Sequence, residues 1–392
     1  MLPSGITRWG IRSVRLLPEW VLRLLLPRRL DFDGADAHRL EFPTASVRLF
    51  IGPVNFASQG YAWARAAERL PGVRAVSMAY HAAGDYGFAV DQPVPASVYL
   101  LSHRWSRQQS ARILADSTHV IIEAGRHLFG DVYGRTVLEE IEQMRAAGIR
   151  VALLSHGSDA RSGPRHRAEH PDSPYHSEAW TDRDALERES EAHRALMRAS
   201  AAPVFVSTPG MIDDVLDARW LPVVVDIARW ETDRVAMADE VPLVVHAPSS
   251  PIVKGSDLIE PALRELADSG LIRYERLSKV PAAQMPQKIA QADIVLDQFR
   301  LGDYGVAACE AMAAGAVVVG NVTESVRGRV RAVTGRELPI VQSRPHEIGS
   351  VLRELVANRR SAQAIAAQGR TFVETTHDGT ASAQVLRAFL ES

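Results

Sequence analysis

The chain has 392 residues, more than one hydrophobic core usually serves, so we expect two domains. Hydrophobic residues make up 46% and charged residues 23% of the sequence, and the formal net charge is −2; this composition is typical of globular proteins and gives no reason to expect a nucleic acid partner. The single cysteine, Cys309, excludes an internal disulfide and any multi-cysteine zinc or iron–sulfur site.

Residues 1–44 precede the regular pattern and form a basic, amphipathic N-terminal extension. Arginines outnumber the single acid, Glu19, within residues 1–30, and tryptophans and leucines lie between them. Pro18 divides this stretch into two expected short helices. A helix with one basic and one apolar face suits an anionic membrane surface. An extension that packs against the rest of the protein is an alternative of equal weight.

The sequence predicts no crossing of a membrane. It has no run of roughly 18 apolar residues, and its N-terminus lacks the apolar core of a signal peptide. A reducing compartment also fits the single cysteine. We therefore expect a cytoplasmic protein, either free or peripheral on the inner face of the membrane.

From Ser46 onward, short apolar runs alternate with helical periodicity in two series. The first series predicts strands at 47–51, 73–78, 118–123, 150–155 and 203–207, and helices at 60–70, 136–147 and 185–200. The second predicts strands at 242–246, 272–277, 294–297 and 316–319, and helices at 256–269, 283–290, 306–314 and from 345 onward. Such alternation is typical of an α/β fold with two parallel sheets.

These series set the expected domain boundaries. We assign an N-terminal Rossmann-like lobe to 45–225, a C-terminal Rossmann-like lobe to 226–375, and a C-terminal helix to 376–392, for which the N-terminal lobe is a possible packing surface. Ligands of parallel sheets bind beyond the carboxyl ends of the strands, so two facing lobes would form a cleft lined by the segments that follow strands.

The segment HAPSSPIVKGSD follows the first strand of the C-terminal lobe. Ser249 and Ser250 are small enough for a close ligand, Lys254 supplies a positive charge, and Gly255 precedes a helix whose first amides favour anions. Lys254 is also one of only three lysines in an arginine-rich chain. These features favour a diphosphate, while the plain alternative is an ordinary turn with an incidental lysine.

The segment from Asp297 to Gly320 places Glu310 inside an alanine-rich helix. A carboxylate offers paired acceptors for a ribose diol, and an acid among apolar neighbours needs a partner. The alternative is a solvated helix glutamate.

Together, HAPSSPIVKGSD and YGVAACEAMAAGAVVVG resemble the donor-binding half of GT-B glycosyltransferases, specifically the retaining family-four group. The resemblance implies two Rossmann-like lobes facing a cleft, Lys254 on the donor diphosphate, Glu310 on the nucleotide ribose, retention at the anomeric carbon and no metal. Lys254 would also stabilise the leaving diphosphate.

Two positions depart from the pattern of that family. Its first motif glutamate falls on Gly302, so the neighbouring Asp303 is the remaining catalytic acid candidate. Its accompanying arginine falls near Ser249, and Arg300 could supply the missing charge. Gly305, where the helix of Glu310 opens, completes the expected donor site.

The N-terminal lobe supplies the candidates for the acceptor side, which follow its strands: Gly60, Glu123, Arg126, His156, Asp159 and Arg161. Among them, His156 and Asp159 are the catalytic candidates, because a histidine can bind a sugar hydroxyl or take an acceptor proton. A structural histidine is the alternative. The first glycine-bearing loop lacks the GxGxxG spacing of a dinucleotide site.

Four histidines in one stretch raise the question of a metal. His156, His166, His170 and His176 match no compact ligand spacing and lie among arginines, so we expect no metal cofactor. Arginines and histidines suit an anionic acceptor better, such as a lipid phosphate.

The sequence therefore predicts a glycosyltransferase that moves a hexose from a nucleotide diphosphate sugar to a glycan or lipid-linked acceptor, as in polysaccharide biosynthesis. One alternative is a nucleotide-sugar epimerase of the same fold. Another is an inactive sugar- or nucleotide-binding relative that serves as a partner subunit.

Overall fold

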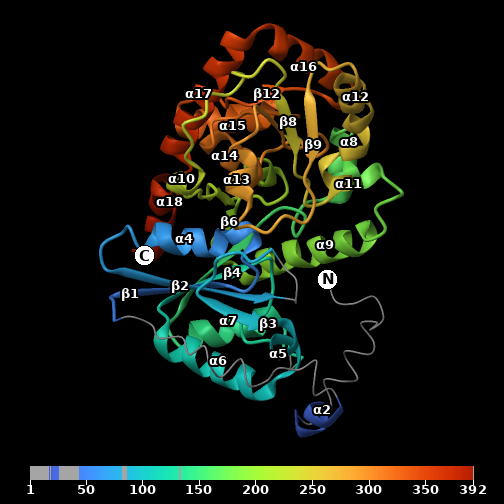
Figure 1. Cartoon of the computed structure of the whole chain (residues 1–392). Coiled ribbons are helices and arrows are strands. Elements are labelled where there is room, and N and C mark those ends of the chain that lie inside the picture. Colours follow the sequence, from blue (N-terminus) through green and yellow to red (C-terminus); the bar gives the residue numbers. More distant parts are fainter. Residues whose placement is uncertain (1–16, 18, 26–43, 82–85, 132–133, 392) are drawn as a thin grey trace. The chain divides into compact units, whose positions relative to one another are not determined.

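A computed structural model describes residues 17, 19–25, 44–81, 86–131 and 134–391 (Figure 1). Its residues fall into two compact units. The first holds the described residues up to His156, together with 193–205 and the residues from Leu386. The second holds 157–192 and 206–385, so it takes in a segment that precedes its main body in the sequence.

Most of the expected N-terminal extension lies outside the described residues. Within it, α2 (Glu19–Leu25) is a short helix with an exposed Trp20 and a buried Leu22. In the part of the chain that the structure describes, no helix is both long and apolar enough to cross a membrane.

The larger sheet has seven strands in the order β3-β2-β1-β4-β5-β6-β7. The pairings of β1 with β2 and β4, of β2 with β3, and of β4 with β5 are parallel. The strands β4 and most of β1 and β5 are buried, which explains their continuous apolar runs. The seven strands are β1 (Val47–Gly52), β2 (Val73–His81), β3 (Gln92–Pro95), β4 (His119–Glu123), β5 (Arg150–Ser155), β6 (Val204–Val206) and β7 (Arg219–Trp220).

The helices between these strands bury one side each. Helix α7 begins with a capping box in which Thr136 and Glu139 satisfy each other's backbone amides. The helical elements along this part of the chain are η1 (Phe56–Ser58), α4 (Gln59–Ala67), α5 (Ala96–Leu101), α6 (His103–Asp116), α7 (Val137–Ala146) and α9 (Arg183–Ser200).

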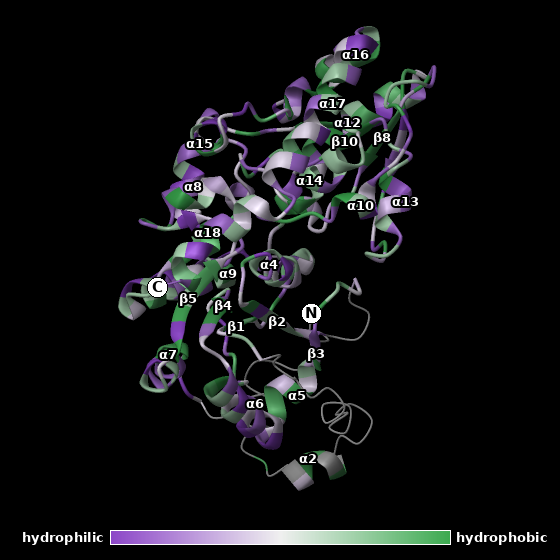
Figure 2. Ribbon diagram, turned by 90° about the vertical axis from the view of Figure 1, so that its left-hand side faces the viewer, coloured by the Kyte–Doolittle hydropathy of each residue, from purple (hydrophilic) through white to green (hydrophobic). Residues whose placement is uncertain are grey.

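The second unit is built on a five-stranded sheet in the order β12-β11-β10-β8-β9, with parallel pairings throughout. The central strands β8 and β10 pack their apolar residues against α12 and α16 in one core. Helix α16 is amphipathic, and Figure 2 shows both green and purple along its turns. The strands are β8 (Leu243–His246), β9 (Arg273–Arg276), β10 (Ile294–Leu296), β11 (Val317–Gly320) and β12 (Val341–Gln342).

The helical elements of this unit include two short pieces from the segment 157–192. These are α8 (Gly163–Glu169) and η2 (Pro174–His176). The remainder are η3 (Pro209–Asp213), α10 (Ile227–Trp230), α11 (Pro251–Lys254), α12 (Ser256–Asp268), α13 (Met285–Ile289), α14 (Val306–Ala313), α15 (Glu324–Thr334), η4 (Pro345–Glu347), α16 (Ile348–Ala357), α17 (Arg359–Thr376) and α18 (Thr380–Leu390).

The expected α/β class with two parallel sheets is confirmed. The nine strands expected from the sequence are all present, with ends shifted by at most a few residues. Three short strands, β3, β7 and β12, were not expected, nor were α5, α6, α8, α10, α11 and α15. The domain boundaries assigned from the sequence stay a prediction.

Candidate active site

Lys254 lies at the end of the short helix α11, directly after β8 in the second unit. Its ammonium group forms an ion pair with the buried carboxylate of Asp297, which follows β10, and its side chain is 16% exposed. Gly255 then takes a left-handed conformation, with φ of +77°. A Cβ there would lie 3.1 Å from Cγ of Arg300, so the turn after Lys254 packs closely on the loop that carries Arg300.

His246 fixes the start of α12 relative to the sheet. Its Nδ1 lies 2.9 Å from the carbonyl oxygen of Leu296, and its Nε2 lies 2.8 Å from Oγ of Ser256. Burial lowers the pKa of His246 to about 4, so the ring is neutral at physiological pH. Ser249 is exposed and Ser250 partly buried; the Ser250 side chain makes no capping bond to α11.

Glu310 lies in the second turn of α14, whose neighbouring residues are small and apolar. Among the residues that the structure describes, its carboxyl group has no hydrogen bond or ion pair. Burial raises the pKa of Glu310 to about 8, and the positive charges of Arg229 and Lys254 oppose this rise. Lys254 is therefore close enough to Glu310 for its positive charge to act on the carboxyl group.

Gly302 occupies the position of the first motif glutamate and has no room for a side chain. Its φ is +69°, a region that favours glycine. A Cβ at this position would lie 2.7 Å from Cγ2 of Thr323 and 3.1 Å from Cε1 of His170. The two constraints together explain why glycine stands here. Gly305, three residues on, is extended and has open space where a Cβ would be.

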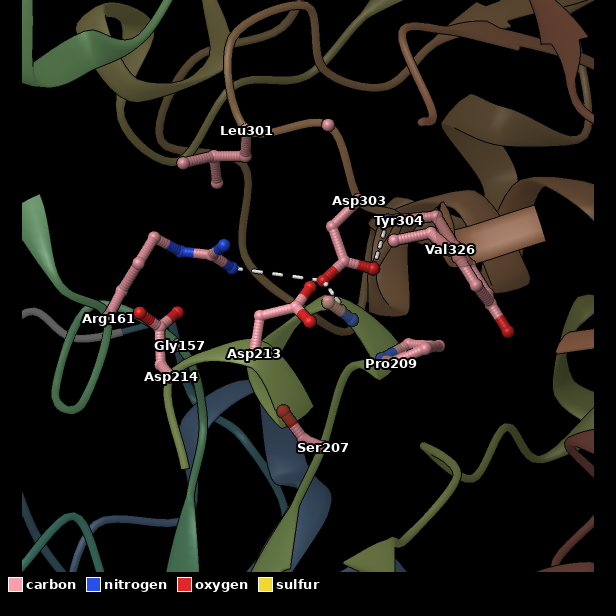
Figure 3. Close-up of polar contacts among 12 residues, drawn as sticks. Gly157, Arg161, Ser207, Pro209, Asp213, Asp214, Leu301, Asp303, Tyr304 and Val326 are labelled. Carbon is pink, nitrogen blue, oxygen red and sulfur yellow. Dashed lines mark hydrogen bonds and ion pairs between the residues drawn. The ribbon is translucent and has the colours of Figure 1, made fainter. Parts of the chain in front are cut away.

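Asp303 is buried, with 2% of its side chain exposed, and its oxygens are used inside the unit (Figure 3). Its Oδ2 accepts a hydrogen bond from the backbone amide of Gly210 at 3.0 Å, and its Oδ1 accepts one from the amide of Tyr304 at 3.0 Å. Burial raises the pKa of Asp303, and the neighbouring Arg161 opposes that rise. This carboxyl group joins the segment after β6 to the start of α14.

Arg161 lies beside Asp303, with Nη2 of Arg161 3.8 Å from Oδ2 of Asp303 (Figure 3). The sequence assigned Arg161 to the acceptor side, and the structure places it in the second unit together with a donor-side candidate. Arg300 is also buried and donates from Nη2 to Asp257 at 2.7 Å. Its Nε has no hydrogen-bond partner within the described chain.

The first unit gathers three acceptor-side candidates around one buried carboxylate. Glu123, at the end of β4, is fully buried. Its Oε2 accepts from the amides of Val54 and Asn55 at 3.1 and 3.0 Å, and its Oε1 lies 3.0 Å from Nε2 of His156. A Cβ on Gly60 would come within 3.1 Å of the same carboxylate, so Gly60 leaves space for it.

Aromatic rings enclose His156 on this side. The rings of Phe56 and Trp63 lie 5.0 and 5.6 Å from it, and Phe56 is 51% exposed. The backbone around the cluster is strained, with positive φ at four residues that are not glycine: Asn55, Ala57, Ser58 and Ala124. Such strain is concentrated at functional sites. The sequence did not single out the two rings, since only the tertiary structure brings them to His156.

Solved structures of low sequence identity share this architecture. Sucrose-phosphate synthase from Thermosynechococcus elongatus matches with a TM-score of 0.58 and 11% identity over 88% of this chain and 98% of that chain. HepE from Anabaena, in complex with UDP and glucose, matches with a TM-score of 0.56 and 12% identity over 88% and 99%. WaaG, a glycosyltransferase involved in lipopolysaccharide biosynthesis, matches with a TM-score of 0.54 and 12% identity over 88% and 100%. These likenesses show the GT-B fold.

Sequence comparison relates the C-terminal part of the chain to glycosyltransferases. Residues 236–388, which include Lys254 and Glu310, match a family described as glycosyl transferase-like. This match covers less than half of the chain. None of the curated protein sequences matches the chain significantly.

The remaining candidate residues make local contacts. The amide of Arg126 donates to the carbonyl oxygen of Glu123 at 3.1 Å. The carboxylate of Asp159 accepts from the amide of Gly157 at 2.6 Å.

Two histidines of the segment 157–192, His166 and His176, have hydrogen-bond partners in the protein. His166 is buried, with Nδ1 2.7 Å from Oγ of Ser173 and Nε2 3.2 Å from the carbonyl oxygen of Leu301. Burial lowers the pKa of His166 to about 3. Nε2 of His176 lies 3.2 Å from the carbonyl oxygen of Arg167. Over the described ranges, no three His, Cys, Asp or Glu side chains are grouped so that they could hold a metal ion.

Proposed function

We propose that the chain is a glycosyltransferase that binds a nucleotide diphosphate sugar in its second unit, with Glu310 on the ribose and Lys254 on the diphosphate. The observation that carries this proposal is the carboxyl group of Glu310, which is partly buried, has no described partner and lies near the charges of Lys254 and Arg229. Two hydroxyl donors of a ribose would satisfy this group.

The surroundings of Lys254 support the diphosphate assignment. Its charge lies at the end of α11, and the next residue, Gly255, opens the 13-residue helix α12. The first amides of that helix and the ammonium group together suit the negative charge that develops when the nucleotide diphosphate leaves. Ser249, Ser250, Arg300 and Gly305 stay in the proposed donor site as residues near its rim.

We further propose that His156 and Glu123 of the first unit act on the acceptor. Glu123 holds Nε2 of His156, and the exposed ring of Phe56 adds an aromatic surface of the kind that sugars stack on. Gly60, Arg126, Asp159 and Arg161 remain lesser candidates. A glycan or lipid-linked acceptor, a hexose as the transferred group, retention and metal independence follow the resemblance to the family-four group.

Binding of nucleotide sugars tests the donor site directly. Isothermal titration calorimetry with UDP-, GDP- and ADP-sugars should select one nucleotide series. The variants Lys254→Ala and Glu310→Gln should each weaken that binding roughly tenfold or more, because the first removes a charge-assisted contact and the second replaces an acceptor oxygen for the ribose by a donor nitrogen. Nucleotide affinity close to that of the wild type in both variants would mean that the donor site lies elsewhere.

Two matched controls and one double variant guard against loss of folding. Lys288→Ala removes a lysine paired with Glu275 outside the site, and Glu324→Gln removes a charge that is 81% exposed; neither should change the affinity. Lys254→Ala leaves Asp297 buried without its cation, so Lys254→Ala/Asp297→Asn should melt closer to the wild type and still bind the nucleotide weakly.

The epimerase alternative rests on the fold alone, which does not fix the reaction. Incubation of the nucleotide sugar without any acceptor separates the two activities, since only an epimerase would produce the epimer, visible by proton NMR. A partner subunit that has lost activity would bind the nucleotide and neither transfer nor slowly hydrolyse the sugar.

A further inference from the structure

Arg161 is a buried cation whose side-chain donors are not used by the described part of the chain. The residue is 4% exposed, and a guanidinium carries five N–H donors. The described structure gives this side chain one ion-pair contact, to Asp303 at 3.8 Å, which is longer than a hydrogen bond. None of its nitrogens is both completely buried and without a partner among the described residues, so the donors keep a small accessible surface at which an acceptor from outside the chain could bind.

Asp303 does not fill that role. Both of its oxygens already accept backbone hydrogen bonds, from Gly210 and Tyr304 at 3.0 Å each. Burial also raises the pKa of Asp303, which disfavours its negative charge. The carboxyl group therefore compensates the guanidinium of Arg161 weakly.

The other acids drawn near Arg161 in Figure 3 are engaged as well. Asp213 forms a two-pronged ion pair with Arg329. Asp214 accepts from Arg165 at 2.7 Å and from the amide of Ser162 at 2.8 Å. Arg161 is the arginine of this group whose guanidinium makes no described hydrogen bond.

The order of groups along the proposed donor site places Arg161 at one end of it. Lys254 pairs with Asp297 at the start of the loop that follows β10, and it acts electrostatically on Glu310 in α14. Gly255 packs on Arg300 further along this loop, and Arg161 lies beside Asp303 at the end of the loop. Ribose, diphosphate and sugar follow one another in a nucleotide sugar, so a donor whose ribose is on Glu310 and whose diphosphate is on Lys254 would direct its sugar toward Arg161.

At the sugar end of the proposed donor site, Arg161 supplies hydrogen-bond donors, and the first motif glutamate of the family-four enzymes is replaced by Gly302. Gly302 has no room for a side chain, because Thr323 and the ring of His170 fill the space where a Cβ would lie. A neutral sugar would leave the guanidinium of Arg161 with hydroxyl oxygens alone, whereas a carboxylate matches its planar fork with two parallel hydrogen bonds.

On the basis of the proposed donor site, we propose that the transferred sugar carries a carboxylate, as a hexuronate does, and that Arg161 binds this carboxylate. The donor would then be a nucleotide diphosphate uronate, and Arg161 would select it over the neutral sugar of the same nucleotide.

Calorimetry with pairs of donors that differ only in the carboxylate tests this proposal. The pair is UDP-glucose and UDP-glucuronate, or GDP-mannose and GDP-mannuronate if the protein selects guanosine. The wild type should bind the acidic donor roughly tenfold or more tightly than the neutral one. Arg161→Met should remove this preference, because it should weaken the binding of the acidic donor far more than that of the neutral donor.

A double variant shows whether Arg161 binds the ligand or only neutralises the negative charge of Asp303. Asp303→Asn should keep the preference for the acidic donor, and Arg161→Met/Asp303→Asn, which buries no unpaired charge, should lose it. Equal binding of the two donors by the wild type, or a preference that survives in the double variant, would overturn the proposal.

The donor site and the carboxylate proposal fail in different ways. If Lys254→Ala and Glu310→Gln leave the binding of both donors unchanged, the donor site itself is wrong. If those two variants weaken both donors while the wild type shows no preference, the donor site stands and Arg161 has no carboxylate to bind.

Discussion

The buried carboxyl group of Glu310 makes the stability of the fold depend on pH. Its pKa in the folded chain is about 8, against 4.5 for a free glutamate side chain. Between these values the folded state keeps a proton that the unfolded state has lost, so this residue lowers the free energy of unfolding as the pH rises. Above about pH 8 the contribution no longer changes.

Glu310→Gln should remove this slope. The variant should gain stability relative to the wild type as the pH rises from 5 to 8, measured by urea denaturation at each pH. Comparison of the two proteins cancels the contributions of the buried histidines, which are common to both. Glu324→Gln, at an exposed site, should show the same pH dependence of stability as the wild type. If Glu310→Gln also shows the same pH dependence as the wild type, the pKa of Glu310 is not raised in the folded protein.

Glu123 organises the loop that follows β1. Its carboxylate accepts from two backbone amides and holds His156, so Glu123→Gln exchanges one acceptor oxygen for a donor nitrogen that faces donors. We expect a loss of about 1–3 kcal/mol in the free energy of unfolding and a lower turnover. Glu142→Gln on the exposed side of α7 is the control, and equal stability of the two variants would count against this role.

Single residues differ in how far the sequence reveals them. Lys254 and Glu310 belong to short local motifs, so their positions after a strand and inside a helix could be predicted. The pairing of Arg161 with Asp303, and the rings around His156, could not, because they join segments far apart in the chain.

At the scale of elements, the loop between β10 and α14 shows why the first motif glutamate is missing. Gly302 combines a positive φ with a closed space, whereas Gly315, after α14, has a similar φ of +73° and nothing within 4 Å of its Cβ position. A comparison of these two glycines therefore distinguishes the cost of backbone strain, which both positions would have with a side chain, from the cost of steric overlap, which only Gly302 would have.

Gly302→Ala should therefore destabilise the protein more than Gly315→Ala does. Both variants strain the backbone by about 1–2 kcal/mol, and only the first also forces Thr323 or His170 to move. Gly302→Glu, which restores the family residue, should lower both melting temperature and activity. A more active Gly302→Glu enzyme would show that the loop can rearrange.

Most of the elements that the sequence did not predict are short, but α6 has 14 residues and α15 has 11. Both of these helices are largely polar and bury few apolar side chains, so their apolar periodicity is weak. Helices α10 and α11 have four residues each, less than the length at which helical periodicity can be recognised. Strands β7 and β12 have two residues each and are defined by their neighbours in the sheet. The other long strands and helices were predictable because their apolar periodicity extends over several turns or pairs.

At the scale of the molecule, the end of the chain contributes to the first unit. Phe389, near the end of α18, is buried, and its ring lies 5.2 Å from that of His119 and 6.1 Å from that of Phe205. Both of these residues belong to the first unit. The residues from Leu386 onward thus pack in the core of the first unit, whereas the helices that precede them belong to the second unit.

Phe389→Ala should cost about 3–5 kcal/mol and act on the first unit. Hydrogen exchange should show faster exchange in β4 and β6 and little change in β8. Phe372→Ala in α17, a buried ring of the second unit that packs on His377, should give the reverse pattern. Uniform acceleration in both units for either variant would mean that they unfold together.

The segment 157–192 belongs to the second unit although most of that unit follows residue 205. A chimera spliced near residue 225, the natural choice from the sequence, would take Asp303 from one parent and Arg161 from the other. Exchanging the C-terminal half between two such proteins would therefore transfer the proposed nucleotide-binding residues without Arg161, which we propose to contact the sugar. Swaps meant to alter donor choice should carry both stretches together.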